Sequence, residues 1–324
     1  MLQKINKQLE KMMPLITPTS VILGVLLAGI LKDYSYLIPW IFAFMTFTGS
    51  LSSNFSSLKQ TLNHPFSLFL VLFILHILMP AWAWGVGHIV FSGDLFTITG
   101  FILAMAIPTG ISSFIWVSIY RGNIPFTLAI ILIDTFLSPL IVPFTLSILV
   151  GEKIEMDVFS MMKGLIGMIV LPSLLGMFLN QWTKGKAKEV WSPRLAPFSK
   201  IGMGLVVLLN GAVVAPHLQD VNLKLFIITI TVFCIAFSGY LFSFLMGKWC
   251  KCDKETIIAL TFTGGMRNIS AGAVIAVSYF PPQVAVPVVI GMLFQQVLAS
   301  IYGLIMDRHF NRTSLVKEKQ TQAM

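Results

Sequence analysis

The stretch TFTGGMRNIS, residues 261–270, places a full positive charge inside an apolar segment of the chain. Arg267 follows closely on two glycines, and no other charged residue lies between Glu255 and Asp307. An ionised side chain at the centre of a bilayer costs at least about 2.5 kcal/mol on insertion scales, so such a group normally faces the protein interior and finds a partner. The surroundings of this arginine therefore constrain both fold and function.

The composition predicts an all-α integral membrane protein. Of 324 residues, 56% are apolar and 11% are charged, and the mean hydropathy is +0.86. Soluble domains have about a quarter of their residues charged. A membrane-crossing helix needs about 20 apolar residues, and ten runs of suitable length are found at 14–32, 36–53, 65–90, 96–120, 125–150, 158–182, 198–216, 222–247, 256–279 and 281–306.

These ten runs divide the chain into two halves of five. We expect a cytoplasmic amphipathic segment at 1–13, a first five-helix repeat at 14–150, a second at 151–306 and a cytoplasmic tail at 307–324. An odd number of helices per half puts the two halves in opposite orientations. The sequence thus favours two inverted repeats.

The basic residues predict the orientation in the membrane. Most of the 22 lysines and arginines fall on the face that carries both termini, and such residues in short loops stay on the cytoplasmic side. We therefore expect a multi-pass protein of the cytoplasmic membrane with both termini in the cytoplasm. The net charge of +9 then reflects topology and attraction to lipid headgroups. The basic residues are spread over loops, so nucleic-acid binding is not expected.

Helix breakers occur at the middle of the fourth run of each half. Residues 105–114, MAIPTGISSF, contain Pro108 and Gly110, and the matching run at 256–279 contains Gly264 and Gly265. Interrupted helices at matching positions of inverted repeats are the best sequence pointer to a transporter's substrate site. The predicted substrate-binding residues are Thr109, Gly110, Ser112, Ser113, Thr263, Gly264, Arg267 and Asn268.

Asp134 is the one acidic residue predicted to lie within the membrane, so it is the natural partner for Arg267. Thr127, Ile131, Asp134 and Ser138 share one helix face by their spacing of four, three and four. The resulting charge pair could serve function or structure, and both interpretations stay open here. His76 and Asp134 are candidate proton-coupling residues, because histidine changes charge near neutral pH. The sequence predicts no cofactor and no metal site of histidines and cysteines.

At the two breaks the sequence resembles the bile acid:sodium symporter family. Further stretches extend the resemblance over most of the chain: FMTFTGSLSSNFSSL at 44–58, HILMPAWAW at 76–84, Tyr120-Arg121-Gly122 and Ser138-Pro139-Leu140. The resemblance implies ten helices in inverted five-helix repeats, with broken helices four and nine crossing at mid-membrane. It also implies transport of carboxylate-bearing solutes such as bile acids, pantoate or keto acids.

Several positions depart from what the resemblance implies for sodium binding. Thr263 stands where the family has a sodium-binding glutamate, and Arg267 where it has a glutamine. Other ligand positions implied by the resemblance hold apolar residues, namely Leu75, Phe114 and Ile131. Sodium is a hard cation that needs oxygen ligands, so these replacements argue against both sodium sites. Arg267 then becomes a candidate tethered substitute for the lost ion, because a guanidinium keeps its charge at physiological pH.

Together these features predict a secondary transporter that moves a small organic anion by alternating access. The alternative is a non-transporting receptor or scaffold, and the lost sodium ligands are the best argument for it. An arsenite-type efflux carrier is less favoured, because such carriers use a membrane cysteine in helix four and residues 96–120 contain none. No metalloprotease, diphosphate or nucleophile–base motif indicates an enzyme. The sequence leaves the substrate, direction, coupling ion and oligomeric state open.

Overall fold

Most of the described chain is helical, with short turns and extended stretches between the helices. The computed structural model describes residues 2–52, 65–151, 157–218 and 222–321. Within these ranges η1 is a 3-10 helix and η2, η4 and η5 are π-helical turns. The elements are α1 (Leu2–Leu26), α2 (Ala28–Leu31), η1 (Lys32–Leu37), α3 (Ile38–Ser50), α5 (Pro65–Phe73), η2 (Ile74–Leu78), α6 (Met79–Val90), α7 (Leu95–Ala106), α8 (Ser113–Ile119), α9 (Ile124–Val150), α10 (Val158–Leu165), η4 (Ile166–Val170), α11 (Leu171–Trp182), η5 (Ala187–Trp191), α12 (Ser192–Leu218), α13 (Leu223–Trp249), α14 (Lys254–Gly265), α15 (Ile269–Tyr279) and α16 (Pro282–Thr321).

Short polar side chains fix where helices α7, α9 and α14 begin. Asp94 caps α7 by accepting from the Thr97 backbone nitrogen, and Asp253 caps α14 by accepting from that of Thr256. Asn123 caps α9 in the same way. Such caps satisfy backbone N–H groups that have no partner within the first turn. The starts of α7, α9 and α14 are therefore set by local sequence.

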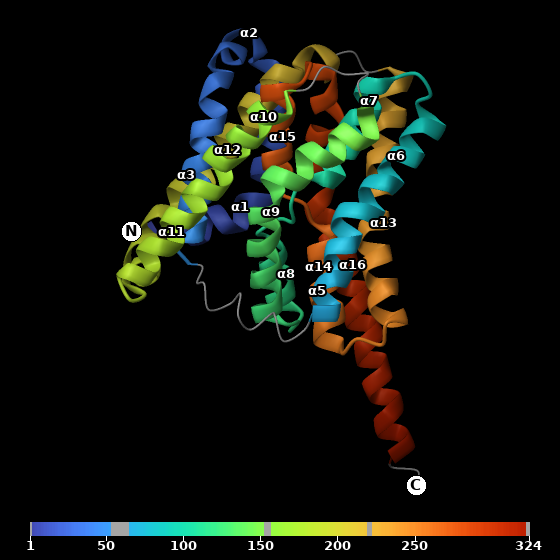
Figure 1. The fold of residues 1–324 in the computed structure, drawn as a ribbon. Helices are drawn as coiled ribbons and strands as arrows, with labels where there is room; N and C mark the ends of the chain where they lie inside the picture. The colour runs from blue at the N-terminus through green and yellow to red at the C-terminus, as the bar shows by residue number, and fades with distance from the viewer. Residues whose placement is uncertain (1, 53–64, 152–156, 219–221, 322–324) are drawn as a thin grey trace.

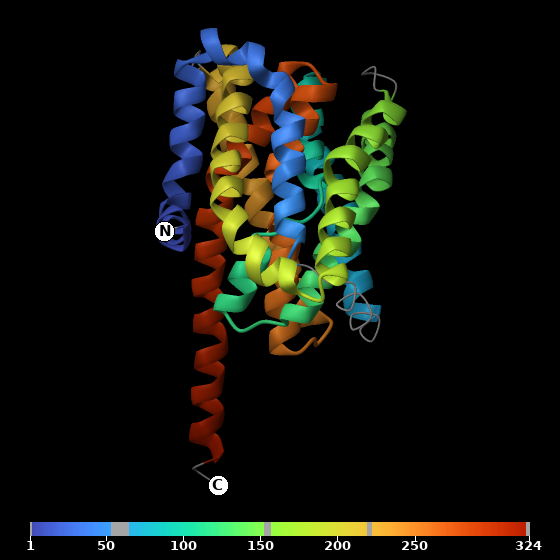
Figure 2. The same cartoon turned by 90° about the vertical axis from the view of Figure 1, so that its left-hand side faces the viewer.

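The helices pack in two groups that run roughly along one direction (Figures 1 and 2). In one group α12 contacts α1 and α3, and α3 also contacts α11. In the other group α7 contacts α6, α9 and α16, while α13 contacts α14 and α16. The groups meet where α12 contacts α15 and α16. Helix α16 continues beyond the bundle toward the C-terminus (Figure 2).

Six described helical segments are long and apolar enough to cross a bilayer, and one bent pair would add a seventh. These six correspond to six of the ten runs predicted from the sequence. They are Pro65–Val90, Ile124–Val150, Val158–Trp182, Ala187–Leu218, Leu223–Trp249 and Pro282–Phe310.

The other four predicted runs are bent or interrupted. Runs 14–32 and 36–53 correspond to the bent pair Leu15–Leu26 and Ala28–Ser50, whose axes differ by 81°. Runs 96–120 and 256–279 are divided between α7 and α8 and between α14 and α15. Their pieces are too short to cross a bilayer alone. Helix α1 runs unbroken from Leu2 through the predicted segment 1–13, and the last three residues of the predicted tail lie outside the described residues.

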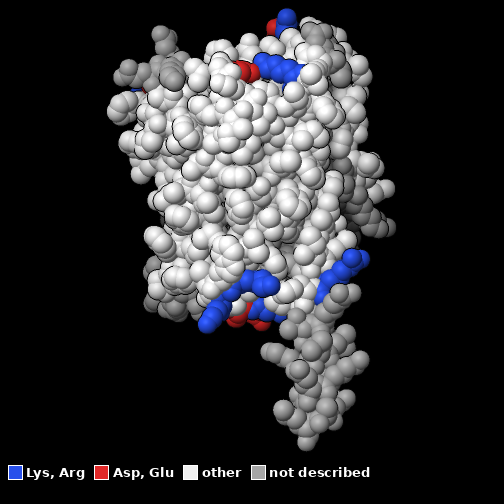
Figure 3. Space-filling view, turned by 90° about the vertical axis from the view of Figure 1, so that its right-hand side faces the viewer, with Lys and Arg blue, Asp and Glu red and all other residues white. Residues whose placement is uncertain are grey.

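Charged side chains gather at the two ends of the molecule on the face shown in Figure 3. A wide belt between these ends carries none on that face. Large apolar side chains are exposed along the helices, for example Ile89, Ile148 and Phe178. Exposed apolar side chains of this kind suit contact with lipid rather than water.

Gly100 allows α7 to pack closely on α16. A Cβ atom at this position would lie 2.5 Å from the Val284 carbonyl oxygen and 2.8 Å from a ring carbon of Pro287. We expect Gly100→Ala to lower the free energy of unfolding by about 1 to 3 kcal/mol, because neither backbone nor proline ring can yield easily. Gly85→Ala on α6, with nothing within 4 Å, is the matched control. Thermal unfolding in detergent measures both, and equal melting temperatures would contradict this packing.

Candidate functional site at two broken helices

The first break separates α7 from α8. Helix α7 ends at Ala106, and Ile107 takes an extended conformation with ψ 151°. The clash between a proline ring and the preceding residue disfavours helical backbone at that residue, so Pro108 explains this ending. Helix α8 resumes at Ser113. The residues from Ile107 to Gly110 are all buried, and their backbone groups therefore need partners inside the protein.

The second break separates α14 from α15. Helix α14 ends at Gly265, and Met266 is extended with φ −94° and ψ 139°. The two predicted helix-breaking glycines are thus the last residues of α14, and the break itself follows them. Their lack of side chains allows α13 to approach, because a Cβ on Gly264 would lie 2.1 Å from the Ser243 hydroxyl and one on Gly265 2.3 Å from the Tyr240 ring.

The two breaks bind each other through the backbone. Thr109 and Arg267 form an isolated antiparallel bridge. The Asn268 nitrogen donates to the Pro108 carbonyl at 2.8 Å, and the Gly110 nitrogen donates to the Met266 carbonyl at 3.4 Å. A Cβ on Gly110 would lie 2.8 Å from the Arg267 carbonyl oxygen, so glycine is required for this approach. The predicted interruptions are therefore in direct contact.

The Arg267 guanidinium binds carbonyl oxygens at the ends of both half-helices. Its Nε donates to the Met105 carbonyl at 3.1 Å, near the end of α7. Its Nη1 donates to the Gly264 carbonyl at 2.8 Å and to that of Met266 at 3.4 Å. The residue is only 2% exposed. These carbonyls carry the partial negative charge of a helix C-terminus, which favours a cation.

One guanidinium nitrogen remains available. Nη2 of Arg267 is buried and has no hydrogen-bond partner among the described residues. The Ser113 hydroxyl, on the first turn of α8, is also buried without a partner in that part of the chain. A buried donor without a partner is unfavourable. Both groups could therefore bind an acceptor on a solute.

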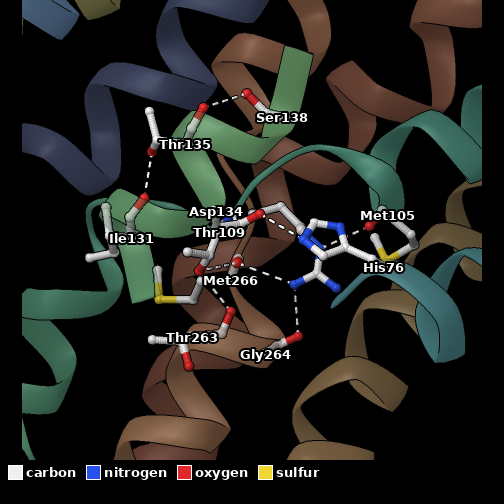
Figure 4. A network of polar contacts seen from close by, with 11 residues as sticks. His76, Met105, Thr109, Ile131, Asp134, Thr135, Ser138, Thr263, Gly264 and Met266 are labelled. Atoms are coloured by element: carbon white, nitrogen blue, oxygen red, sulfur yellow. Dashed lines mark hydrogen bonds and ion pairs between the residues drawn. The ribbon is translucent and has the colours of Figure 1, made fainter. Parts of the chain in front are cut away.

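Asp134 does not form the expected ion pair with Arg267. Its Oδ2 accepts from the Thr109 backbone nitrogen at 2.6 Å, and its Oδ1 lies 2.9 Å from Nε2 of His76. Figure 4 shows the carboxylate between these two partners. The guanidinium is directed to carbonyls instead, so the two charges of the predicted pair are not in direct contact, and the role of the pair stays a prediction. Asp134 is completely buried.

Asp134 and Arg267 nevertheless share one broken helical turn. In a continuous helix the Thr109 nitrogen would donate to the Met105 carbonyl, four residues earlier. Here that nitrogen donates to Asp134 and that carbonyl accepts from Arg267. The acid binds the orphaned donor and the base binds the orphaned acceptor. The two charges are therefore linked through the backbone of the first break.

The polar side chains predicted for the site have different partners. The Thr109 hydroxyl donates to the carbonyls of Thr263 and Met266 at 2.7 and 3.1 Å. The Thr263 hydroxyl donates within its own helix to the Ala259 carbonyl, and the Asn268 side chain caps α15. Ser112 is partly exposed at the start of α8. Of the predicted residues, Arg267 and Ser113 each have a buried hydrogen-bond donor without a partner among the described residues.

His76 lies in η2, a π-helical turn followed by Pro80. Pro80 has no N–H to donate to the His76 carbonyl four residues earlier. The Met79 nitrogen donates to the Ile74 carbonyl, five residues earlier, which is the hydrogen bond of a π-helical turn. Single π-helical turns are frequent at functional sites. The turn places the imidazole at the crossing, against Asp134.

Sequence reasoning missed the contribution of α16. The Gln295 side-chain oxygen accepts from the Arg267 backbone nitrogen at 3.0 Å, and the Tyr240 hydroxyl donates to the Gln295 carbonyl. The Gln296 side chain likewise accepts from the Trp116 indole at 3.0 Å. The available signal was the adjacent glutamine pair in an apolar run, since a polar group inside a membrane segment needs a partner.

Two broken helices that meet inside a membrane protein are typical of secondary transporters, and the comparisons with known proteins agree. A model of the SBF-like CPA transporter family matches residues 28–311. The chain belongs to this family, so it is a multi-pass membrane transporter and not an enzyme.

Three relatives illustrate the breadth of the similarity. The chain is 55% identical to the uncharacterized protein YbaS of Bacillus subtilis, over 91% of this chain and 97% of the relative. It is 26% identical to the probable sodium/metabolite cotransporter BASS1 of Arabidopsis thaliana, over 90% and 73% respectively. It is 24% identical to the uncharacterized sodium-dependent transporter YocS of Bacillus subtilis, over 89% and 88%.

The Thr109 hydroxyl should stabilise the crossing. We expect Thr109→Val to lower the free energy of unfolding by about 1 to 3 kcal/mol, because it leaves the buried Thr263 carbonyl without its donor. Thr109→Ser keeps the hydroxyl and serves as control. Thermal unfolding compares the two variants. A valine variant as stable as the serine variant would exclude this role for the hydroxyl.

Proposed function

We propose that the protein is a secondary transporter of small carboxylate-bearing anions that needs no sodium, because Arg267 supplies the positive charge at the crossing. The candidate solutes are those of the bile acid, pantoate or keto acid type. The observation that carries the proposal is a buried guanidinium bound to both helix ends, with Nη2 left without a partner among the described residues.

An anionic solute suits this geometry. A guanidinium offers planar N–H donors that match a carboxylate, and here two of its three nitrogens are already bound to carbonyl oxygens. The remaining nitrogen and the Ser113 hydroxyl can each donate to a carboxylate oxygen. The protein thus holds a positive charge in place for the solute before it arrives.

The absence of a sodium requirement is inferred from the replaced ligands. Leu75 is 1% exposed and Ile131 is 6% exposed, so apolar side chains fill two of the positions where the resemblance implies oxygen ligands. The Thr263 hydroxyl is already bound to a carbonyl of its own helix. Meanwhile Arg267 binds the carbonyl oxygens that a cation could otherwise use. Two relatives have sodium in their names, and we propose that this chain differs from them.

We further propose the topology of ten spans in two inverted repeats, with both termini in the cytoplasm and the protein in the cytoplasmic membrane. The contacts between the two breaks and the distribution of basic residues support it. In this arrangement the site at the crossing would open to each side of the membrane in turn.

Replacing Arg267 should remove anion binding. We expect at least one of pantoate, pyruvate and cholate to raise the melting temperature of the purified protein in choline buffer. In Arg267→Gln the affinity should fall by about 30-fold or more, because truncating one partner of a buried charge pair costs about 2 to 5 kcal/mol. Thermal shift titrations measure this. Arg194→Gln, at an exposed position, should bind as the unchanged protein does.

The same acids can be followed into proteoliposomes with sodium replaced by choline. We expect the rate of counterflow to be the same in sodium medium and in choline medium. A strict need for sodium would contradict the tethered-cation part of the proposal. Indifference to all three acids in both binding and transport would favour the receptor or scaffold alternative.

A further inference from the structure

We infer that His76 and Asp134 form a proton-binding site, and that the protein moves one proton together with each monovalent carboxylate. This inference rests on the proposed function, because it takes Arg267 as the group that receives the carboxylate. The distance between Nε2 of His76 and Oδ1 of Asp134 is 2.9 Å, and the two side chains are 8% and 0% exposed.

The His76 ring is bound on one side only. Its Nδ1 is buried and has no hydrogen-bond partner among the described residues. Its Nε2 faces the Asp134 carboxylate without the alignment of a hydrogen bond, so the contact is electrostatic. A proton taken up by the imidazole would turn this contact into a buried ion pair. Histidine is the side chain best suited to gain and lose a proton near neutral pH.

The elements packed around η2 offer few competing charges. The sequences of α5 and α7 contain no titratable side chain. Helix α6 contributes His88, which is partly exposed and bound to the Trp84 carbonyl. Helix α13 contributes the Tyr240 hydroxyl at this level, bound to a carbonyl of α16.

The remaining charges near η2 lie away from the crossing or belong to it. On α13, Lys224 and Lys248 lie at the ends of the helix and Cys234 is exposed. On α14, Lys254 and Glu255 belong to the first turn. Among the described residues, the charges at the crossing itself are therefore those of Arg267, Asp134 and, when protonated, His76.

The balance of these charges dictates the coupling. With His76 neutral and no solute bound, Arg267 and Asp134 give a net charge of zero. A carboxylate alone would make the site negative, and a proton alone would make it positive. A net charge is strongly unfavourable in a buried site of low dielectric constant. Proton and carboxylate together restore zero, so each should favour the binding of the other.

A physical connection joins the two binding groups. Asp134 accepts from the Thr109 nitrogen, and Arg267 donates to the Met105 carbonyl. These backbone groups would be hydrogen-bonded to each other if α7 continued past Ala106, where the break begins. A proton on His76 attracts the Asp134 carboxylate and so weakens its hold on the Thr109 nitrogen. Protonation is thereby felt at the same turn that positions the guanidinium.

During transport the proton would enter from the aqueous phase and bind the imidazole while the carboxylate binds Arg267. After the site opens to the other side, the imidazole would release the proton and the carboxylate would follow. No covalent bond other than that to the proton is made or broken.

Proteoliposomes test the coupling with radiolabelled pantoate, pyruvate and cholate as probes. An inward proton gradient of about one pH unit should drive about tenfold accumulation of a transported acid inside the vesicles. Symport of one proton with each anion transfers the free energy of the proton gradient to the anion. An imposed membrane potential should not change this ratio, because the cycle carries no net charge. Protein-free vesicles correct for passive entry of the undissociated acid.

His76→Gln keeps a polar side chain beside Asp134 but cannot carry the proton. In this variant the accumulation ratio should fall to that of protein-free vesicles, while counterflow, although slower, stays measurable. His88→Gln replaces the partly exposed histidine of α6 and should accumulate acid as the unchanged protein does.

A binding measurement covers the case in which His76→Gln does not fold well enough for reconstitution. In weakly buffered detergent solution with a pH indicator, the unchanged protein should take up one proton for each acid molecule bound. Binding without proton uptake would overturn the inference.

The outcomes separate the two proposals. Counterflow that proceeds while accumulation ignores the pH gradient would overturn proton coupling and leave anion transport standing. Accumulation that persists in His76→Gln would overturn the role of the pair. Absence of binding and counterflow for all three acids would refute the proposed function, and this inference with it.

Discussion

The buried guanidinium of Arg267, bound to carbonyl oxygens at two helix ends, is the interaction on which the rest of the site depends. Breaking a helix inside a membrane frees backbone groups that have no water to bind. At this crossing several of the freed groups are satisfied within the protein. Met105 and Gly264 offer carbonyls to the guanidinium, and the Thr263 carbonyl accepts from the Thr109 hydroxyl. The charge therefore holds two interrupted helices together.

Asp134 balances this arrangement without touching the arginine. It takes the Thr109 nitrogen that would otherwise bind the Met105 carbonyl, which frees that carbonyl for Arg267. The acid thus binds the donor and the base binds the acceptor of a helical hydrogen bond that the break has opened. This geometry explains how the chain contains both charges in its interior while each keeps a separate partner. It also leaves one oxygen of Asp134 for His76 and one nitrogen of Arg267 without a partner among the described residues.

The sequence predicted the general form of the site but not its pairings. Pro108 marked the first break, because it restricts the backbone locally. The glycines before Arg267 marked the second, although they are the last residues of α14 and serve the close approach of α13. The isolated charges in apolar runs marked the residues of the interior. The partner of Asp134 could not be predicted, because it depends on how α9 sits against η2 and the first break. Gln295 was missed for the same reason, since only the packing of α16 brings it to the Arg267 nitrogen.

A positive charge fixed to the chain differs from a bound sodium ion in one decisive respect. A sodium ion enters from one side and leaves on the other, so its gradient can drive the solute. In the proposed function Arg267 supplies the same charge at the crossing but stays in place, and therefore transmits no energy from any gradient. A transporter of this design either equilibrates its solute or couples it through another exchangeable group. At this crossing, among the described residues, the imidazole of His76 is the group whose chemistry allows that exchange.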